Sequence, residues 1–195
     1  MPVISIIGAP GVGKSFLVKQ LACLHCMPCF FEGEIGIFTD DVLKVLNGEQ
    51  DSPQRYVWLL DRFKRNLEAA HKASSAGLTC FVDGDILSVE SWLLAENGQF
   101  SPTVLYKWLK ENQHLRADKT LILVASEEKI KQNMNSRGRA AEMTGFIHER
   151  MLRIQNAMKQ VAKNHPECVL LDRTNLDFTN PRTLKEVSLI LELKI

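Results

Sequence analysis

The sequence predicts an α/β fold in which a five-stranded parallel sheet is covered by helices on both faces. Short apolar runs of strand length alternate along the chain with longer segments of helical periodicity, which is the pattern of right-handed βαβ units. The run Thr120–Ala125 contains five consecutive apolar residues, as expected for a strand that is buried on both faces of a parallel sheet. A glycine-rich segment, Gly8–Ser15, lies directly after the first apolar run, where a loop would join the first strand to the first helix.

Each of the five strands is predicted from a short apolar run that ends at a glycine or a polar residue. In chain order they are Val3–Ile7, Cys29–Phe31, Thr79–Val82, Thr120–Ala125 and Cys168–Leu171. Because parallel strands need crossover connections, the helices between them are expected on the faces of the sheet.

Helices are predicted where apolar residues recur at intervals of three and four. The clearest pattern starts at Pro53 and continues to Ala70, with Ser52 as its cap. A second long pattern runs from Ile147 to Val161. The complete set is Lys14–His25, Asp40–Leu46, the long helix from Pro53, Val89–Ala95, Pro102–Asn112, a helix that starts at Ser126, one from about Thr144, and Leu184–Leu191.

The composition is that of a neutral chain with ordinary apolar content. Its 195 residues include 24 Lys and Arg against 23 Asp and Glu, so the net charge is +1, and 45% of the residues are hydrophobic. This balance excludes a strongly basic nucleic-acid binder, so no nucleic-acid partner is expected. The longest apolar runs fall far short of the roughly 18 residues of a membrane span, so no membrane partner is expected either.

One domain over residues 1–195, located in the cytoplasm, is predicted from the same features. A chain of this length buries an adequate core without disulfides or a structural metal, and its first residues lack the basic region of a signal peptide. The odd count of five Cys favours reduced thiols. Cys23, Cys26 and Cys29 have the spacing of an iron–sulfur or zinc segment, with three ordinary thiols as the plainer alternative.

The glycine-rich segment is a complete phosphate-binding loop (P-loop). The pattern G-x-x-x-x-G-K-[ST] is matched by Gly8, Ala9, Pro10, Gly11, Val12, Gly13, Lys14 and Ser15. Glycines let successive backbone N–H groups turn toward phosphate oxygens, and the helix that follows adds a favourable dipole. Lys14 is expected to reach the β and γ phosphates and Ser15 to ligate Mg²⁺. ATP and Mg²⁺ are therefore the predicted cofactors, against the alternative of an ordinary glycine turn before a helix.

Four carboxylates follow predicted strands, where ligands of parallel sheets bind. Asp83 follows the third strand and is expected to hold Mg²⁺ directly or through water. Glu32 follows the second strand, as does Glu34, and either one could take a proton from an acceptor hydroxyl. Glu34 and Asp85 are also candidates for contacts with the substrate. The alternative for each of the four is a solvated loop charge.

A short arginine lid is predicted at about residues 133–145. Arg137 and Arg139 flank a glycine in the connection between two helices. Two arginines there can close over a nucleotide and neutralise charge on the transferred phosphoryl group. Arg137 is therefore a candidate for both nucleotide binding and catalysis, and a solvated basic turn is the alternative.

Together these motifs resemble the deoxyribonucleoside kinase family. The resemblance runs through most of the chain and combines a P-loop with an arginine lid and a Leu-Asp-Phe segment. It rests on Gly8 to Ser15, Phe31-Glu32, the segment Arg55-Tyr56 to Phe63, Asp83, Arg137-Gly138-Arg139 with Glu142, and Leu176-Asp177-Phe178.

The resemblance implies a P-loop kinase fold and transfer of the ATP γ-phosphate to a nucleoside 5′-hydroxyl. It implies Glu32 as the base, the lid arginines on the phosphates, Glu142 near the sugar, and adenine between the lid and residues 173–178. It also implies a homodimer.

The chain departs from the family on the acceptor side. Gly84 stands where the family usually has Arg, Arg55 where it has a base-reading Gln, and Val89 where it has Asp. Asn133 replaces the first arginine of the usual lid. The predicted function is therefore an ATP-dependent phosphotransferase for a small-molecule hydroxyl, with a (deoxy)nucleoside as the first acceptor. The alternatives are a nucleoside monophosphate, to which Arg55 could pair, another metabolite, or a nucleotide-binding regulatory protein.

Overall fold

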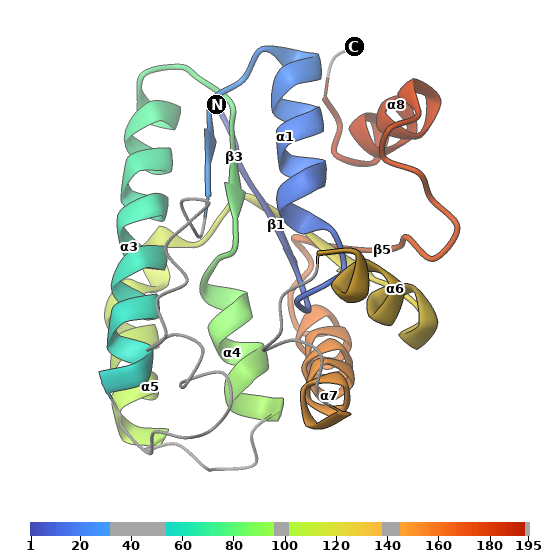
Figure 1. The fold of residues 1–195 in the computed structure, drawn as a ribbon. Helices are drawn as coiled ribbons and strands as arrows, with labels where there is room; N and C mark the ends of the chain where they lie inside the picture. The colour runs from blue at the N-terminus through green and yellow to red at the C-terminus, as the bar shows by residue number, and fades with distance from the viewer. Residues whose placement is uncertain (32–53, 96–101, 138–144, 194–195) are drawn as a thin grey trace.

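The computed structural model describes residues 1–31, 54–95, 102–137 and 145–193, and it shows a central sheet with helices on both sides (Figure 1). The sheet has five strands in the order β2-β3-β1-β4-β5. Every neighbouring pair is parallel. The strands are β1 Val3–Gly8, β2 Cys29–Phe30, β3 Cys80–Asp83, β4 Lys119–Val124 and β5 Cys168–Asp172. The predicted fold class is confirmed.

The helices follow the predicted pattern closely. They are α1 Lys14–His25, α3 Gln54–Ser75, α4 Ile86–Ala95, α5 Pro102–Asn112, α6 Glu127–Arg137, α7 Gly145–Ala162 and α8 Pro181–Ile190, with a 3₁₀ turn η1 at Gln113–Leu115. The helix predicted at Asp40–Leu46 lies outside the described residues. Among the described residues, no helix is both long enough and apolar enough to cross a membrane.

Two helices begin three residues earlier than predicted because polar side chains cap them. The carboxylate of Asp85 accepts hydrogen bonds from the backbone N–H groups of Leu87 at 2.8 Å and Ser88 at 3.3 Å, so α4 starts at Ile86. Asn180 accepts from the Arg182 N–H at 2.9 Å, and α8 therefore starts at Pro181. Caps of this kind satisfy N–H groups that have no partner inside the helix.

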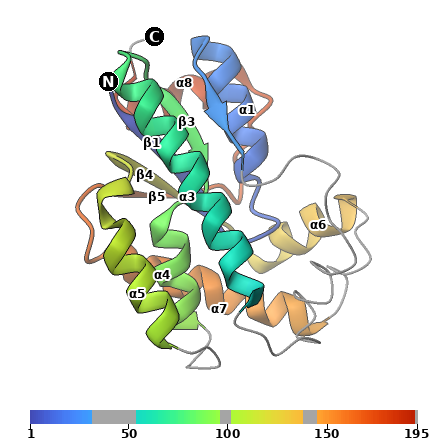
Figure 2. The same cartoon turned by 90° about the vertical axis from the view of Figure 1, so that its left-hand side faces the viewer.

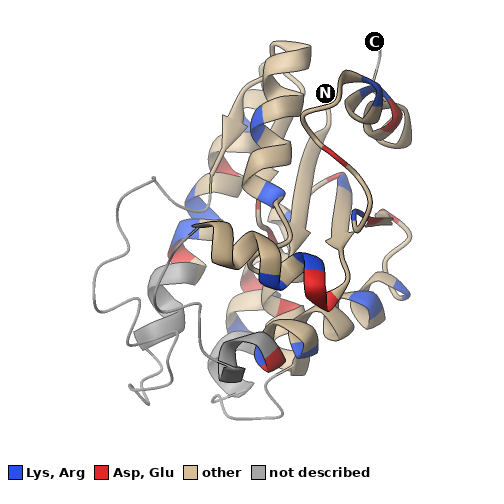
Figure 3. Cartoon of the chain, turned by 45° about the vertical axis from the view of Figure 1, so that its right-hand side comes forward, with Lys and Arg blue, Asp and Glu red and all other residues tan. Residues whose placement is uncertain are grey.

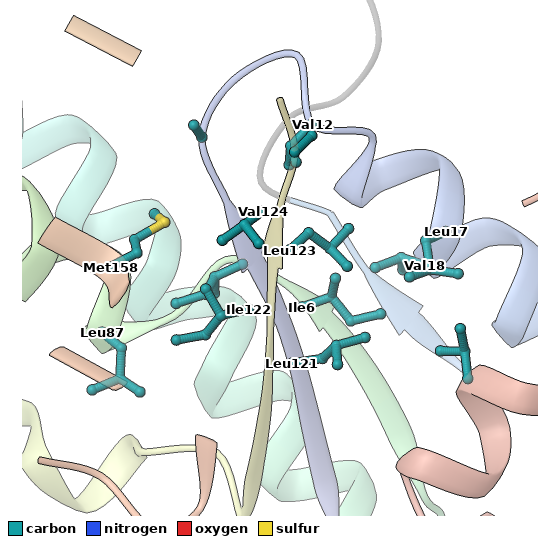
Figure 4. Close-up of a cluster of buried hydrophobic side chains, with 14 of the residues drawn as sticks. Ile6, Val12, Leu17, Val18, Leu87, Leu121, Ile122, Leu123, Val124 and Met158 are labelled. Carbon is teal, nitrogen blue, oxygen red and sulfur yellow. The ribbon is translucent and has the colours of Figure 1, made fainter. Parts of the chain in front are cut away.

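Side chains of β4 alternate between the two faces of the sheet, as Figure 4 shows. Leu121 and Leu123 point toward α1, whereas Ile122 and Val124 point toward the opposite layer, where Met158 of α7 lies. Leu121, Ile122 and Leu123 are fully buried. Because burial of one such side chain contributes about 1.5–3 kcal/mol, this strand anchors both helical layers.

The buried core consists of two clusters of hydrophobic side chains. One cluster joins α3, β3, α4 and α5, and Figure 2 shows α3 in front of β3. The other cluster joins β1 and β4 to α1, α6, α7 and α8. The register pairs Ile6 with Asp83 and Gly8 with Leu123. The carboxyl ends of β1, β3 and β4 therefore lie next to one another, where the P-loop leaves the sheet.

One domain over residues 1–195 stays a prediction. The lid predicted at about 133–145 also stays a prediction, because residues 138–144 lie outside the described ranges. Figure 3 shows Lys and Arg on several helices, interspersed with Asp and Glu.

Candidate active site

The P-loop connects the end of β1 directly to the start of α1. Gly13 precedes the first turn of α1 with φ 96°, a left-handed conformation that glycine adopts without steric cost. Within the described part of the chain, no side chain caps this helix end. The N–H groups of the first turn are therefore available to an anion, and the helix dipole adds to the attraction. Lys14 lies half-buried in the same turn.

Ser15 and Asp83, the two residues that were assigned to Mg²⁺ from the sequence, come together beside the P-loop. The Ser15 hydroxyl donates a hydrogen bond to Oδ2 of Asp83. Asp83 is 2% exposed, and among the described residues its Oδ1 has no hydrogen-bond partner. A buried carboxylate oxygen without a partner is costly, and a hydroxyl beside a carboxylate is the kind of hard oxygen pair that Mg²⁺ prefers. The two residues therefore fit a magnesium ion.

Asp85 does not occupy the substrate-facing position that the sequence predicted. Its side chain is fully buried. Oδ2 accepts from the Thr120 hydroxyl at 2.9 Å, and Oδ1 accepts from the N–H groups that begin α4. Burial raises the pKa of this carboxyl, and these hydrogen bonds oppose the rise. Asp85 therefore has a structural role, which is to join α4 to β4.

Gly84 lies between these two aspartates and leaves no room for a side chain. Its φ is +91°, and a Cβ there would lie 2.5 Å from the Cε1 atom of Phe63 in α3. The Phe63 ring in turn packs against Trp92 at 5.8 Å between centroids. Val89 is 1% exposed and belongs to the same core cluster. Neither Gly84 nor Val89 can therefore supply the acceptor contacts that the kinase family makes at these positions.

Two further side chains hold the backbone of the P-loop from outside. Asn133 of α6 donates from Nδ2 to the Gly11 carbonyl at 2.8 Å. Arg173, directly after β5, donates from Nη1 to the Val12 carbonyl at 3.0 Å. Neither residue was expected at the P-loop from the sequence. For Arg173, the sequence did contain one indication of such a position. An arginine directly after the fifth strand lies at the edge of the sheet where ligands bind.

Several predicted site residues lie outside the part of the chain that the structure describes. These are Glu32, Glu34, Arg139 and Glu142. Arg55 and Arg137 are placed as residues of α3 and α6, without a description of their side chains. Their predicted roles stay predictions.

The cysteines of the Cys-x-x-Cys-x-x-Cys segment lie at and after the end of α1. Cys23 and Cys26 are exposed and Cys29 is half-buried. Burial raises the pKa of the Cys29 thiol, and Lys19 opposes this rise. Among the described residues, no group of three or more His, Cys, Asp or Glu could hold a metal ion.

Solved structures with a similar fold include a deoxyadenosine kinase and a thymidylate kinase. A deoxyadenosine kinase from M. mycoides with bound dATP has a TM-score of 0.75 and 15% identity, and the alignment covers 98% of this chain and 100% of that chain. The same kinase with dCMP and dCDP bound gives 0.74 and 14%, over 97% and 98%. A thymidylate kinase from Candida albicans gives 0.65 and 14%, over 98% and 91%. The resemblance stated from the sequence is confirmed at the level of the fold.

One protein-family model matches most of the chain. None of the curated proteins matches it in sequence. The family model described as AAA domain matches residues 3–160, a range that includes the P-loop, Asp83 and the buried strands β1, β3 and β4. On this match, the chain belongs to the AAA domain family.

Proposed function

We propose that this protein is an ATP-dependent phosphotransferase that moves the γ-phosphate to a small-molecule hydroxyl, the 5′-hydroxyl of a (deoxy)nucleoside. The observation that carries the proposal is the meeting of Ser15 and Asp83 beside a complete P-loop. These two oxygen ligands, a lysine and an uncapped helix end together form a triphosphate and metal site. The shared fold with a deoxyadenosine kinase and a thymidylate kinase supports the kinase class.

The donor half of the mechanism uses described residues. Backbone N–H groups of the P-loop bind the phosphate oxygens, and Lys14 pairs with the β and γ phosphates. Ser15 and Asp83 would hold Mg²⁺, which when bound neutralises charge on the phosphate chain. Asn133 and Arg173 donate hydrogen bonds to the Gly11 and Val12 carbonyls, which holds the backbone of the loop in place for phosphate binding.

The acceptor half uses residues whose predicted roles come from the sequence. Glu32 takes the proton of the acceptor hydroxyl, whose oxygen then forms a bond to the γ phosphorus. The bond from the γ phosphorus to the bridging oxygen breaks, and ADP leaves with that oxygen. Arg137 and Arg139 stabilise the charge on the transferred group. Glu34 and Glu142 contact the acceptor, and the base of ATP lies between the lid and residues 173–178.

A nucleoside monophosphate is the second candidate acceptor. Arg55 lies in the first turn of α3, and an arginine pairs well with a phosphate that a neutral nucleoside lacks. The fold shared with a thymidylate kinase favours this possibility. The space at Gly84 is closed by Phe63, so in either case the acceptor is positioned without the arginine that the deoxyribonucleoside kinase family uses.

A screen for acceptor-stimulated ADP release from Mg²⁺-ATP tests the proposal. Deoxynucleosides, nucleoside monophosphates and sugars are added singly, with the Lys14→Ala variant as the blank. Stimulation by a deoxynucleoside supports the first candidate, and stimulation by a monophosphate supports the second. ATP binding without stimulation by any acceptor would contradict both and indicate a nucleotide-binding regulatory protein.

A homodimer in the cytoplasm is the last part of the proposal. It follows from the resemblance to the deoxyribonucleoside kinase family and from the composition of the chain. Light scattering of the purified protein measures the mass in solution, and a monomer would contradict the dimer. Fractionation of cells that express the full chain tests the location.

A further inference from the structure

Arg173 occupies an unusual position for an arginine, because its side chain is buried beneath the P-loop. Its backbone N–H donates to the Val124 carbonyl at 2.9 Å, which holds the residue at the end of β5 beside β4. Only 9% of the residue is exposed. From there the guanidinium donates through Nη1 to the Val12 carbonyl at 3.0 Å. The side chain therefore contacts the phosphate loop at a backbone carbonyl.

The approach of Arg173 depends on Gly13. A Cβ at Gly13 would collide with Nη1 of Arg173, and the residue has a left-handed backbone conformation. The glycine that the P-loop pattern requires for phosphate binding also creates the space for the guanidinium. Arg173 and Gly13 thus fit together as one packing unit at the start of α1.

The other edge of the same guanidinium holds the loop between β5 and α8. Nη2 donates to the Leu176 carbonyl at 3.3 Å, and the Leu176 N–H donates back to the Arg173 carbonyl at 3.0 Å. The guanidinium also lies 4.7 Å from the centroid of the Phe178 ring, a distance typical of a cation–π contact. One side chain therefore links the P-loop to residues 173–178.

The positive charge of Arg173 is poorly compensated by the protein. Its hydrogen bonds go to carbonyl oxygens, and among the described residues no carboxylate lies within 4.0 Å of the guanidinium and its Nε has no partner. Burial lowers the pKa of Arg173, and Asp177 opposes this effect. A buried cation that forms no close ion pair favours the binding of an anion nearby. A polyphosphate in the P-loop would supply that negative charge.

We propose that Arg173 is a positioning residue that couples the phosphate and base parts of the nucleotide site. By holding Val12 and Leu176 with one guanidinium, it keeps the P-loop and the β5–α8 loop in a single relative arrangement. When phosphate binding orders the P-loop, Arg173 also orders the β5–α8 loop for the base. The entropic cost of binding the whole nucleotide is therefore lower. This inference rests on the proposed function, in which the β5–α8 loop faces the base.

The coupling is measured by comparing ATP with tripolyphosphate, which lacks the base and the sugar. Isothermal titration of the wild-type protein with each ligand gives the ratio of the two dissociation constants. In Arg173→Met, we expect ATP to bind roughly 10-fold to 100-fold more weakly, because hydrogen bonds from a charged group to two loops are lost. The preference for ATP over tripolyphosphate is expected to fall by about 10-fold.

Arg182→Met is the matched control, because Arg182 is exposed on α8 and pairs with Glu186 at 3.2 Å. Both ligands are expected to bind this variant as they bind the wild type. If Arg173→Met fails to fold, Arg173→Lys replaces it as the test variant. Lysine keeps the positive charge but cannot reach both the Val12 and the Leu176 carbonyls. This variant is expected to bind tripolyphosphate nearly normally and to lose the preference for ATP.

The possible outcomes separate the two proposals. A wild-type protein that binds neither ligand contradicts the proposed function, and the role of Arg173 falls with it. A wild-type protein that binds both, combined with an unchanged ratio in a folded Arg173 variant, overturns the coupling alone. A lower melting temperature with an unchanged ratio would show a purely structural role, and it would also overturn the coupling.

Discussion

The phosphate end and the acceptor side of this protein lie next to each other and differ in how they are built. At the phosphate end, Ser15 and Asp83 face each other beside an uncapped helix end. On the acceptor side, Gly84 is closed off by Phe63, and Asp85 is buried as a helix cap. Polar groups at the phosphate end are left for a ligand, whereas those on the acceptor side are used by the fold.

This difference shows which part of the reaction the described structure constrains. Binding of a triphosphate requires a fixed backbone and a few fixed polar atoms, and these are all present. Recognition of an acceptor requires side chains that match its shape and hydrogen bonds. Two of the positions that serve this purpose in the deoxyribonucleoside kinase family hold Gly84 and Val89, which pack against or within the core.

The largest effect is expected for Lys14→Ala, which tests whether the phosphate end performs catalysis. Loss of the cation that faces the β and γ phosphates is expected to reduce phosphoryl transfer by about a thousandfold. The rate of acceptor-stimulated ADP release measures this reduction in phosphoryl transfer. Lys19→Ala is the control, because Lys19 is exposed on the same helix and lies 5.6 Å from the Phe31 ring centroid. Equal losses in the two variants would contradict a specific role for Lys14.

Arg139→Ala tests whether the lid acts in the transition state. We expect kcat to fall by about a hundredfold, with a much smaller change in the dissociation constant for ATP, because the charge on the transferred group develops during transfer. Steady-state kinetics and isothermal titration measure the two quantities. Full retention of kcat would remove Arg139 from the mechanism.

Gly84→Ala tests how tightly the acceptor side is packed. The new Cβ meets Phe63 at 2.5 Å in a left-handed backbone conformation, so the free energy of unfolding is expected to fall by about 2–4 kcal/mol. Gly77→Ala is the control, because Gly77 has φ +87° and open space around its Cβ position. It should lose only about 1 kcal/mol from backbone strain. Urea denaturation measures the free energy of unfolding of both variants. Equal decreases would show that the contact with Phe63 contributes nothing to the effect of Gly84→Ala.

Asp85→Asn tests the buried cap through the dependence of stability on pH. Because burial raises the pKa of Asp85 in the folded protein, ionisation is less favourable there than in the unfolded chain. The wild type is therefore expected to lose stability relative to Asp85→Asn as the pH rises from about 4 through the raised pKa. Urea denaturation of both proteins over this pH range measures the difference.

Asp172→Asn gives the matched comparison of opposite sign. The side chain and then the backbone N–H of Thr174 lower the pKa of Asp172, so its ionised form contributes stability above the unfolded-state pKa of about 3.9. The variant is expected to be the less stable protein at neutral pH, and the difference should disappear at low pH. The same direction of change for both variants would contradict the structural assignment of Asp85.

The sequence by itself determined the fold class and most helix bounds, and it placed Ser15 and Asp83 at the same edge of the sheet. The reason is that periodicity and the P-loop pattern are local signals, and parallel strands necessarily bring their carboxyl ends to one edge. Asp83 could be predicted as a residue of the Mg²⁺ site because it stands at the end of a buried strand. The caps at Asp85 and Asn180 were missed because each depends on hydrogen bonds that shift a helix start by one turn.

Only the tertiary structure decided the contacts of Asp85, Gly84 and Arg173. Asp83 and Asp85 stand two residues apart in the same sequence context, yet one faces Ser15 and the other accepts from Thr120 in β4. Arg173 contacts Val12 across 161 positions of sequence. Such contacts depend on which neighbours the folded chain supplies. No local pattern of residues carries that information, because it arises only when β1, β3, β4 and β5 are aligned in one sheet.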